Sequence, residues 1–339
     1  MSLDRIQAAL LGGAVGDALG AGVEFSTLAD IRARFGPAGV TGFVSAYGRL
    51  GAITDDTQMT LFTGEGLIRA YQRFGEKGIV DPPSVIHRAY LRWLDTQGIQ
   101  GDGSTSWLAS TPDMRHRRAP GNTCLSALQS GVMGTLDTPI NNSKGCGGVM
   151  RIAPIGLVID DPFDLAAEAA AITHGHPSGF LSSGALAVML RALVKGGTLA
   201  EAVGDGFRSL DGRPGAAETI DALGAAIALS QHGAPTPETV ETLGGGWVGE
   251  QALAIAVYCA LVAEDFDSGV ILAANHSGDS DSTASIAGQL LGAVGGTEVI
   301  ADRWLEQLEL RAEIERIAAD LHRYLVLEEE IPWDEYPGS

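Results

Sequence analysis

Apolar residues recur at helical spacing along most of the 339-residue chain. The first such segment, Leu3–Ala21, contains Gly12, Gly13, Gly16 and Gly20, which would let a second helix approach closely. Similar spacing predicts further helices over Thr54–Phe74, Pro82–Thr96, Cys124–Met133, Pro162–Ile172, Ser182–Lys195, Leu199–Leu210, Ala216–Gln231, Trp247–Ala263, Phe266–Ala274, Asp281–Val294 and Arg303–Leu325. Strand-like alternation is nearly absent and no change of composition marks a linker. We therefore predict an all-α fold, with residues 1–339 in a single domain.

Three stretches have no clear period and are predicted to be loops: Gly22–Gly51, Gly98–Asn122 and Asn141–Gly148. They are rich in glycine, proline or small polar residues. Because long ordered loops inside a folded domain are usually functional, we expect part of the chemistry to lie there.

The charge of the chain narrows the range of partners. There are 42 acidic and 22 basic side chains, a formal charge of −20 and a pI of about 4.6. Such a surface repels phosphate backbones, which argues against general binding of nucleic acids or anionic membranes. To bind an anionic ligand, the protein would need a local positive charge that offsets its negative surface, and bound divalent cations are one candidate. Solubility alone accounts for most of the acidic residues.

The three cysteines, Cys124, Cys146 and Cys259, are too few and too widely spaced for a disulfide framework or a thiolate zinc site. The first residues lack the basic and then apolar pattern of a signal peptide. The longest apolar stretch, Ala252–Ala263, is too short to cross a bilayer. We therefore expect a cytoplasmic protein without a membrane span.

Two groups of acidic and hydroxyl side chains lie at predicted helix starts, Thr54–Thr57 and Asp279–Thr283. Helix capping is the simplest explanation, since Ser, Thr and Asp are favoured there. A cap needs one oxygen, however, whereas each group holds two carboxylates, and Asp279 and Asp281 do not share a helix face. An oxygen-only cation site is the alternative, which favours Mg²⁺, Mn²⁺ or Ca²⁺ over Zn²⁺. If both groups face one cavity, they could share two cations.

Other polar residues give weaker signals. Asp17 lies in an apolar helix and would need a partner, most simply a backbone amide. Glu24, just beyond that helix, is a candidate acid or base, and His276 could orient the turn before the second acidic group. The basic residues of Arg115–Arg118 could receive a diphosphate or a protein substrate, or could be a solvated loop.

Two stretches rich in glycine or histidine complete the set. Lys144–Arg151 offers backbone amides that could hold phosphate. It contains Cys146, for which a structural thiol is the simpler explanation because no base adjoins it. Thr173–Pro177 contains His174 and His176, and without a third ligand their spacing favours a hydrogen-bonding loop over a metal site.

Taken in order, these motifs resemble the ADP-ribosylglycohydrolase family, the group that includes the dinitrogenase reductase-activating glycohydrolase. The resembling segments are Gly13–Gly20 with Glu24, Thr54–Thr57, Ser143–Arg151 with Ala153–Gly156, Thr173–Gly179 and His276–Gly288. Each motif is modest by itself, but their common order over most of the chain is specific. Cys146 stands where well-studied members often carry Asn, and Ser282 replaces the commoner Thr but keeps the hydroxyl.

The resemblance implies a compact, orthogonal multi-helix bundle with a binuclear Mg²⁺ or Mn²⁺ centre. The implied metal ligands are Thr54, Asp55, Asp56, Asp279, Asp281 and Ser282. The implied catalytic residues are Glu24, on a mobile loop, Asp55, Asp56 and Asp281. The implied substrate-binding residues are Ser143, Lys144, Gly145, Cys146, Gly147, Gly148, His174 and His176.

We therefore hypothesise a metal-dependent hydrolase that cleaves the glycosidic bond between ADP-ribose and a modified side chain and releases ADP-ribose. Arginine is the favoured linkage by similarity to the bacterial type, and bound cations would orient the distal ribose and polarise a water molecule. The alternatives are hydrolysis of serine-ADP-ribose, of O-acetyl-ADP-ribose or of a nucleotide diphosphate, and a non-catalytic ADP-ribose-binding member of the fold. The expected partner is an ADP-ribosylated protein, and the chain is expected to be a monomer.

Overall fold

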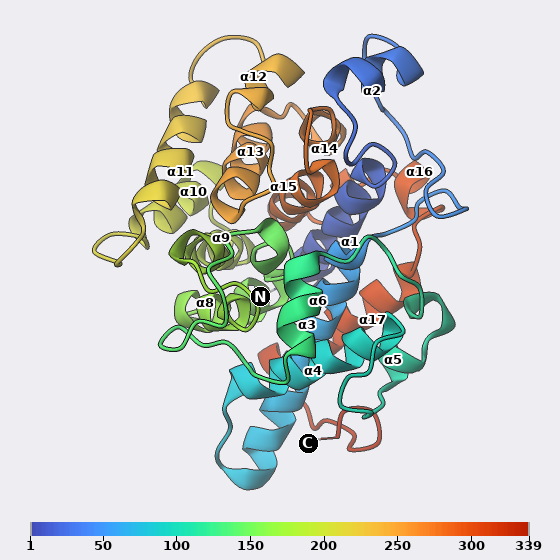
Figure 1. The fold of residues 1–339 in the computed structure, drawn as a ribbon, viewed down its shortest axis with the longest axis vertical. Coiled ribbons are helices and arrows are strands. Elements are labelled where there is room, and N and C mark those ends of the chain that lie inside the picture. The colour runs from blue at the N-terminus through green and yellow to red at the C-terminus, as the bar shows by residue number, and fades with distance from the viewer. Residues whose placement is uncertain (1, 338–339) are drawn as a thin grey trace.

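The computed structural model describes residues 2–337, which fold mainly into helices (Figure 1). Helices make up 61% of the chain, and between residues 2 and 337 the only β-structure is a pair of isolated bridges. The α-helices are α1 (Leu3–Gly20), α2 (Leu28–Phe35), α3 (Asp55–Lys77), α4 (Pro82–Thr96), α5 (Trp107–Ser110), α6 (Asn122–Gln129), α7 (Ala153–Val158), α8 (Phe163–Ala171), α9 (Pro177–Val194), α10 (Leu199–Arg208), α11 (Ala217–Ser230), α12 (Pro237–Glu241), α13 (Gly249–Val262), α14 (Phe266–Ala274), α15 (Ser280–Gly295), α16 (Asp302–Leu305) and α17 (Arg311–Leu321). Short 3₁₀ or π turns are η1 (Pro112–Met114), η2 (Cys146–Gly148), η3 (Thr297–Val299) and η4 (His322–Val326). The predicted all-α fold is confirmed.

Helices α1 and α15 pack against each other near the centre of the molecule (Figure 1). A Cβ atom added to Gly16 would lie 1.9 Å from the carbonyl oxygen of Ala284, and one added to Gly20 would lie 2.4 Å from the Cα atom of Asp281. Any side chain at these positions would push the two helices apart. The predicted close contact of the glycine-rich first helix is therefore confirmed, and it brings the start of α15 beside the end of α1.

The buried apolar residues form one connected cluster, which runs from Ile6 in α1 to Tyr336. Helix α9 is long and apolar enough to cross a membrane by length and composition, although the sequence predicted no such span. In the structure 78% of this helix is buried, and it packs against α8, α10 and α7. Burial of this extent is typical of a core helix in a globular protein.

Part of the predicted loop Gly22–Gly51 is helical. Helix α2 begins with a capping box, in which the Thr27 hydroxyl accepts a hydrogen bond from the backbone N–H of Asp30 at 3.1 Å. Only Leu28 and Ile31 of this helix are buried. Its apolar period is thus too short to stand out in the sequence, and the capping signal alone marks it.

The predicted helix Arg303–Leu325 is wrong as a single element. Helix α16 ends at Leu305 and α17 begins at Arg311, directly after Leu310, which adopts a left-handed conformation with φ of 58°. A continuous α-helix of L-residues does not accommodate this conformation. The remaining predicted helices are present, with ends that differ by a few residues.

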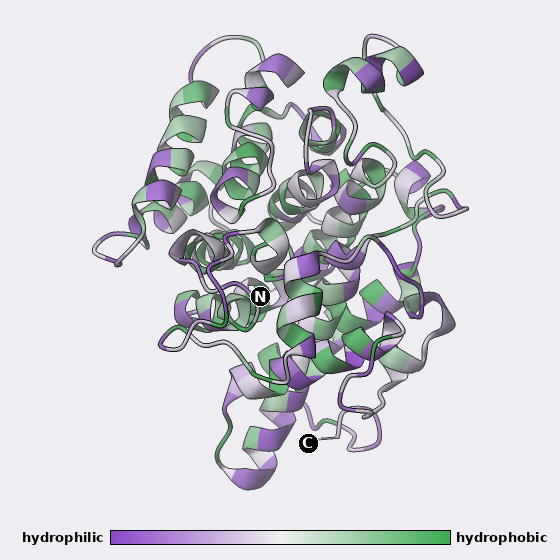
Figure 2. Ribbon diagram, in the orientation of Figure 1, coloured by the Kyte–Doolittle hydropathy of each residue, from purple (hydrophilic) through white to green (hydrophobic). Residues whose placement is uncertain are grey.

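Helix α3 runs from the interior to the surface. Residues 55–70 are buried, whereas the last two turns are partly or fully exposed. These turns, with the start of α4, form the mainly polar lower end of the molecule in Figure 2. The first residues of α3, Asp55 and Asp56, therefore lie inside the protein, where unpaired acidic side chains are rare.

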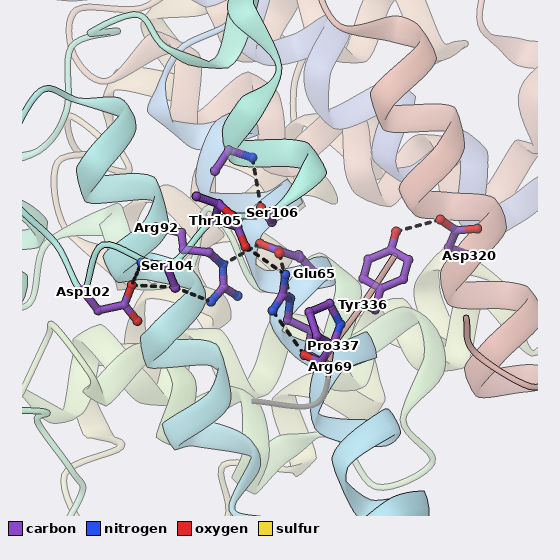
Figure 3. A network of polar contacts seen from close by, with 11 residues as sticks. Glu65, Arg69, Arg92, Asp102, Ser104, Thr105, Ser106, Asp320, Tyr336 and Pro337 are labelled. Carbon is purple, nitrogen blue, oxygen red and sulfur yellow. Dashed lines mark hydrogen bonds and ion pairs between the residues drawn. The ribbon is translucent and has the colours of Figure 1, made fainter. Parts of the chain in front are cut away.

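A buried polar network joins α3 to α4 and to the end of the described chain (Figure 3). The carboxylate of Glu65 accepts hydrogen bonds from Nε of Arg69 at 2.9 Å and from Nε of Arg92 at 3.3 Å. The Arg69 guanidinium also donates to the backbone oxygens of Thr105 and Pro337, at 3.4 and 3.2 Å. The negative charge of Glu65 thus offsets part of the positive charge of two buried arginines.

Candidate functional site

The two acidic groups, Thr54–Thr57 and Asp279–Thr283, meet at one cavity of about 330 Å³, a size typical of small-molecule sites. The carboxylates that line it are Glu24, Asp55, Asp56, Asp279 and Asp281. They come from the turn after α1, the start of α3 and the start of α15. Distant parts of the chain therefore contribute one acidic surface.

The carboxylates lie close together. One oxygen of each of Glu24, Asp279 and Asp281 lies within 4.8 Å of the others. Asp56 is buried, and its Oδ1 atom has no hydrogen-bond partner. Among the described residues that line the cavity, none has a Lys or Arg side chain, so no protein cation balances this charge.

This arrangement disfavours the charged forms of Glu24, Asp55, Asp56 and Asp279. Burial, and then the charges of Asp281 and Asp279, raise the pKa of Glu24 to about 10. Burial and the charge of Asp281 also raise the pKa of Asp55, Asp56 and Asp279 well above the usual range. A divalent cation bound between these groups would offset their repulsion.

The donors that face the cavity fit a hard divalent cation. The lining residues supply carboxylate groups and the hydroxyl of Ser282, and oxygen is the ligand that Mg²⁺ and Mn²⁺ prefer. The buried Oδ1 atom of Asp56 has no hydrogen-bond partner. All the predicted metal ligands line the cavity except Thr54. The hydroxyl of Thr54 instead caps α3 and accepts from the backbone N–H of Asp56 at 3.3 Å.

Asp17 of α1 holds the start of α3 in place. Its carboxylate accepts hydrogen bonds from the backbone N–H of Thr54 at 3.0 Å, from that of Thr57 at 3.1 Å and from the Thr57 hydroxyl. The backbone partner predicted for this buried acid is thus confirmed. Burial and the charge of Asp281 raise the pKa of Asp17 to about 7. Asp17 orients the first acidic group without lining the cavity itself.

The turn that carries the second acidic group packs against the backbone of Gly245. The backbone N–H of Asp279 donates to the carbonyl oxygen of Gly245 at 2.8 Å. A Cβ atom on Gly278 would lie 2.0 Å from the same oxygen, so this approach requires glycine. Nε2 of His276 hydrogen-bonds with the hydroxyl of Thr283 at 2.9 Å, which agrees with the orienting role predicted for this histidine.

The predicted substrate-binding residues divide into two sets. Those that line the cavity are Gly145, Cys146, Gly147 and His174, and those that do not are Ser143, Lys144, Gly148 and His176. Lys144 is paired with Glu218 at 2.9 Å and Glu250 at 2.8 Å. Nδ1 of His176 accepts from the backbone N–H of Ser178 at 3.1 Å and caps α9. Polar contacts within the protein thus already engage Lys144 and His176.

Cys146 lies in the cavity wall as a hydrogen-bond donor. Its thiol donates to Oδ2 of Asp279 at 2.7 Å. Burial and the charge of Asp279 raise the pKa of Cys146 well above its usual range. Since the thiolate is the nucleophilic form, this environment supports a structural thiol.

Two aromatic residues of the cavity were not predicted. The rings of Phe25 and Trp247 stack with centroids 5.3 Å apart and an angle of 20°, and Phe25 directly follows Glu24 in the chain. Phe25 is 71% exposed and has a left-handed φ of 64°, a rare conformation for a bulky residue that is typical of functional sites. Trp247 was placed in a helix that in fact begins at Gly249.

The basic residues of Arg115–Arg118 do not form one binding surface. Arg118 is buried, lies 2.7 Å from Glu309 in an ion pair and stacks over Tyr47. Arg115 and Arg117 are exposed, and none of the three lines the cavity.

Comparisons with known proteins find relatives over most of the chain. Residues 1–330 match the sequence profile of the ADP-ribosylglycohydrolase family. The chain is 29% identical to ADP-ribosyl-[dinitrogen reductase] glycohydrolase of Rhodospirillum rubrum over 320 residues, 92% of each protein. It is 25% identical to ADP-ribosylarginine hydrolase Tri1 of Pseudomonas putida (strain GB-1), over 94% of this chain and 78% of that one. A solved structure described as an ADP-ribosylglycohydrolase-related protein complex is 30% identical, with a TM-score of 0.66, and the match covers 95% of this chain and 98% of that one.

Proposed function

Because the chain belongs to the ADP-ribosylglycohydrolase family and is an ADP-ribosyl glycohydrolase, we propose a specific form of that activity. The enzyme depends on two divalent cations, Mg²⁺ or Mn²⁺, that bind in the acidic cavity. Its substrate is a protein with an ADP-ribosylated arginine, and its products are ADP-ribose and the free arginine side chain.

The observation that carries this proposal is the group of five carboxylates that face one cavity without a cationic side chain among them. A folded protein keeps such a group only when something outside the chain offsets the repulsion or when the strain serves function. The buried, unpartnered Oδ1 atom of Asp56 is an acceptor that a cation would satisfy.

Asp55, Asp56, Asp279 and Asp281, with the hydroxyl of Ser282, are the residues that would hold the cations. When bound, such cations supply Lewis-acid activation of water and of ribose hydroxyls. In the reaction, the oxygen of a water molecule forms a bond to the anomeric carbon, the bond from that carbon to the arginine nitrogen breaks, and a proton reaches the leaving nitrogen.

In this proposal Glu24 transfers that proton. It is partly exposed at the cavity, and its carboxylate lies beside those of Asp279 and Asp281. A carboxyl group within reach of the scissile bond can serve as general acid or base. Glu24 lies in the turn after α1, so the α1–α15 contact places it relative to the metal-binding acids.

The stacked rings of Phe25 and Trp247 support arginine as the modified residue. A planar guanidinium stacks well on aromatic faces and is attracted to nearby carboxylates. Both features meet beside Glu24, where the leaving side chain would lie. A serine side chain is short and neutral, and it would use neither. The similarity to a protein named ADP-ribosylarginine hydrolase also supports this choice.

The test compares arginine-linked and serine-linked ADP-ribosyl peptides, with Mg²⁺ or with chelator, and measures released ADP-ribose. We expect release from the arginine-linked peptide only, and only with the cation. Asp281→Ala should lower the rate by at least about a hundredfold and weaken Mg²⁺ binding together. The matched control Glu315→Ala, at a partly exposed acid of α17 that does not line the cavity, should change neither. Full activity of Asp281→Ala in chelator would discard the metal-dependent mechanism.

A further inference from the structure

Arg151 is a buried cation without a carboxylate partner. It is fully buried, and within residues 2–337 no carboxylate is among its hydrogen-bond partners, which include the sulfur atoms of Met59 and Cys124 on the Nη1 side. Its Nη2 atom donates to the backbone oxygen of Ala169 at 3.2 Å and to the hydroxyl of Thr173 at 2.8 Å, and its guanidinium lies over the ring of Tyr90. An unpaired charge in the core is costly, so its contacts need an explanation.

The contact with Thr173 leads directly to the cavity. The Thr173 hydroxyl also lies 2.8 Å from Nδ1 of His174. Arginine can only donate hydrogen bonds, so the Thr173 oxygen accepts from Arg151 and its own proton is free to reach Nδ1. The Thr173 hydroxyl could also donate its proton to the thiol of Cys124, but a thiol is a weaker acceptor than an imidazole nitrogen. This chain of donors favours Nδ1 as the acceptor and Nε2 as the nitrogen that carries the imidazole proton.

The Nε2 atom of His174 faces the glycine loop of the cavity wall. A Cβ atom added to Gly145 or to Gly147 would lie 3.2 Å from it, and both glycines line the cavity with His174. Among the described residues no side chain or backbone group forms a hydrogen bond with this nitrogen. Burial and the charge of Arg151 lower the pKa of His174 to about 3, so the ring is neutral.

We propose that Arg151 and Thr173 are positioning residues that fix His174 as the Nε2–H tautomer, which donates a hydrogen bond to an oxygen of the bound ADP-ribosyl group. The identity of this ligand rests on the proposed function, whereas the tautomer does not. A neutral donor suits this cavity, because a protonated histidine would pair with the carboxylates and compete with a bound cation.

The tautomer can be measured directly on the unmodified protein. In ¹⁵N-histidine-labelled protein, a long-range ¹H–¹⁵N correlation spectrum distinguishes protonated from unprotonated ring nitrogens, and His174→Asn identifies the signal among the seven histidines. We expect His174 to carry its proton on Nε2. A proton on Nδ1, or on both nitrogens at neutral pH, would overturn the proposal.

Two variants separate positioning from folding. Thr173→Val removes the hydroxyl at nearly constant volume, and Thr173→Ser keeps it. We expect Thr173→Val to lose the single tautomer and to bind ADP-ribose about tenfold more weakly in calorimetry with Mg²⁺ present. Thr173→Ser should retain both properties, and Mg²⁺ binding without ADP-ribose should be unchanged in both variants.

The outcomes distinguish this proposal from the proposed function. Unchanged affinity for ADP-ribose in Thr173→Val, with the tautomer lost, would show that His174 does not donate to the ligand. If the unmodified protein binds Mg²⁺ but not ADP-ribose, the proposed function fails, and a proton found on Nε2 would still support the positioning by Arg151 and Thr173.

Discussion

The protein buries two groups of charged side chains that are built in opposite ways. Around Glu65, one carboxylate lies between two arginines, at 2.9 and 3.3 Å, and backbone oxygens accept further hydrogen bonds from Arg69. In the cavity, five carboxylates face one another, and no lysine or arginine is among the described residues that line it. In the first group both arginines pair with Glu65, although Nη2 of Arg92 has no hydrogen-bond partner. In the second group no Lys or Arg side chain pairs with the carboxylates that line the cavity.

This difference separates a structural role from a functional one. A buried carboxylate that pairs with cationic side chains of the protein needs no cation from outside. A crowd of like charges raises the pKa of its members, as with Glu24, Asp55, Asp56 and Asp279, and so opposes folding at neutral pH. Acids with strongly raised pKa values in a cavity are typical of functional sites. Three experiments test the difference between the Glu65 network and the acids of the cavity.

The largest effect is expected at Glu65. The substitution Glu65→Gln would leave Arg69 and Arg92 buried without a counter-charge, and the free energy of unfolding should fall by about 3–5 kcal/mol. Urea denaturation followed by circular dichroism measures it. In the control Glu315→Gln, a partly exposed pair with Arg311 is removed, and the loss should stay below about 0.5 kcal/mol. Equal losses of unfolding free energy in the two variants would show that the buried network stabilises the fold no more than an exposed ion pair does.

Magnesium should bind to the acids of the cavity and not to the network around Glu65. A cation that binds only the folded protein stabilises it by about 2.7 kcal/mol at a hundred times its Kd, which raises the midpoint of thermal unfolding. We expect this rise in the unmodified protein and in Glu65→Gln, because that change leaves the cavity intact. An unchanged midpoint in both proteins, with Mg²⁺ at millimolar concentration, would contradict the proposed metal centre.

The same contrast explains which parts of the site were predictable. The acidic groups and the glycines of α1 were recognisable in the sequence because both are unusual in helices. Each acidic group has more carboxylates than a helix cap needs, and the glycines lie within a helix. That the groups share one cavity was not visible, since it depends on the packing of α1 against α15, where Gly16 and Gly20 allow backbone contact.

Other features depended on geometry that local pattern does not carry. His174 and His176 were equivalent in the sequence, but α9 begins at Pro177, so His176 caps the helix while His174 lines the cavity. Trp247 lies outside α13 because that helix begins two residues later, and an aromatic residue in an apolar stretch is more often part of the core. The left-handed conformation of Leu310 likewise interrupts Arg303–Leu325, whose apolar pattern predicts a single helix.

The smallest effect, and the one with an unusual sign, is expected at Asp281. Its charge contributes to the raised pKa of Glu24, Asp55, Asp56 and Asp279. Asp281→Asn removes that charge, and an amide oxygen can still accept the hydrogen bond from the backbone N–H of Ser282. In the presence of chelator the variant should therefore be more stable than the unmodified protein, by about 1 kcal/mol at neutral pH.

With Mg²⁺ the order should reverse, because the unmodified protein gains the binding energy and Asp281→Asn does not. The measurement is urea denaturation of both proteins with chelator and with saturating Mg²⁺. A variant that is less stable in chelator would mean that Asp281 stabilises the fold as the Glu65 network does. The acidic cavity would then be one more balanced part of the core, and the reason to place cations there would be lost.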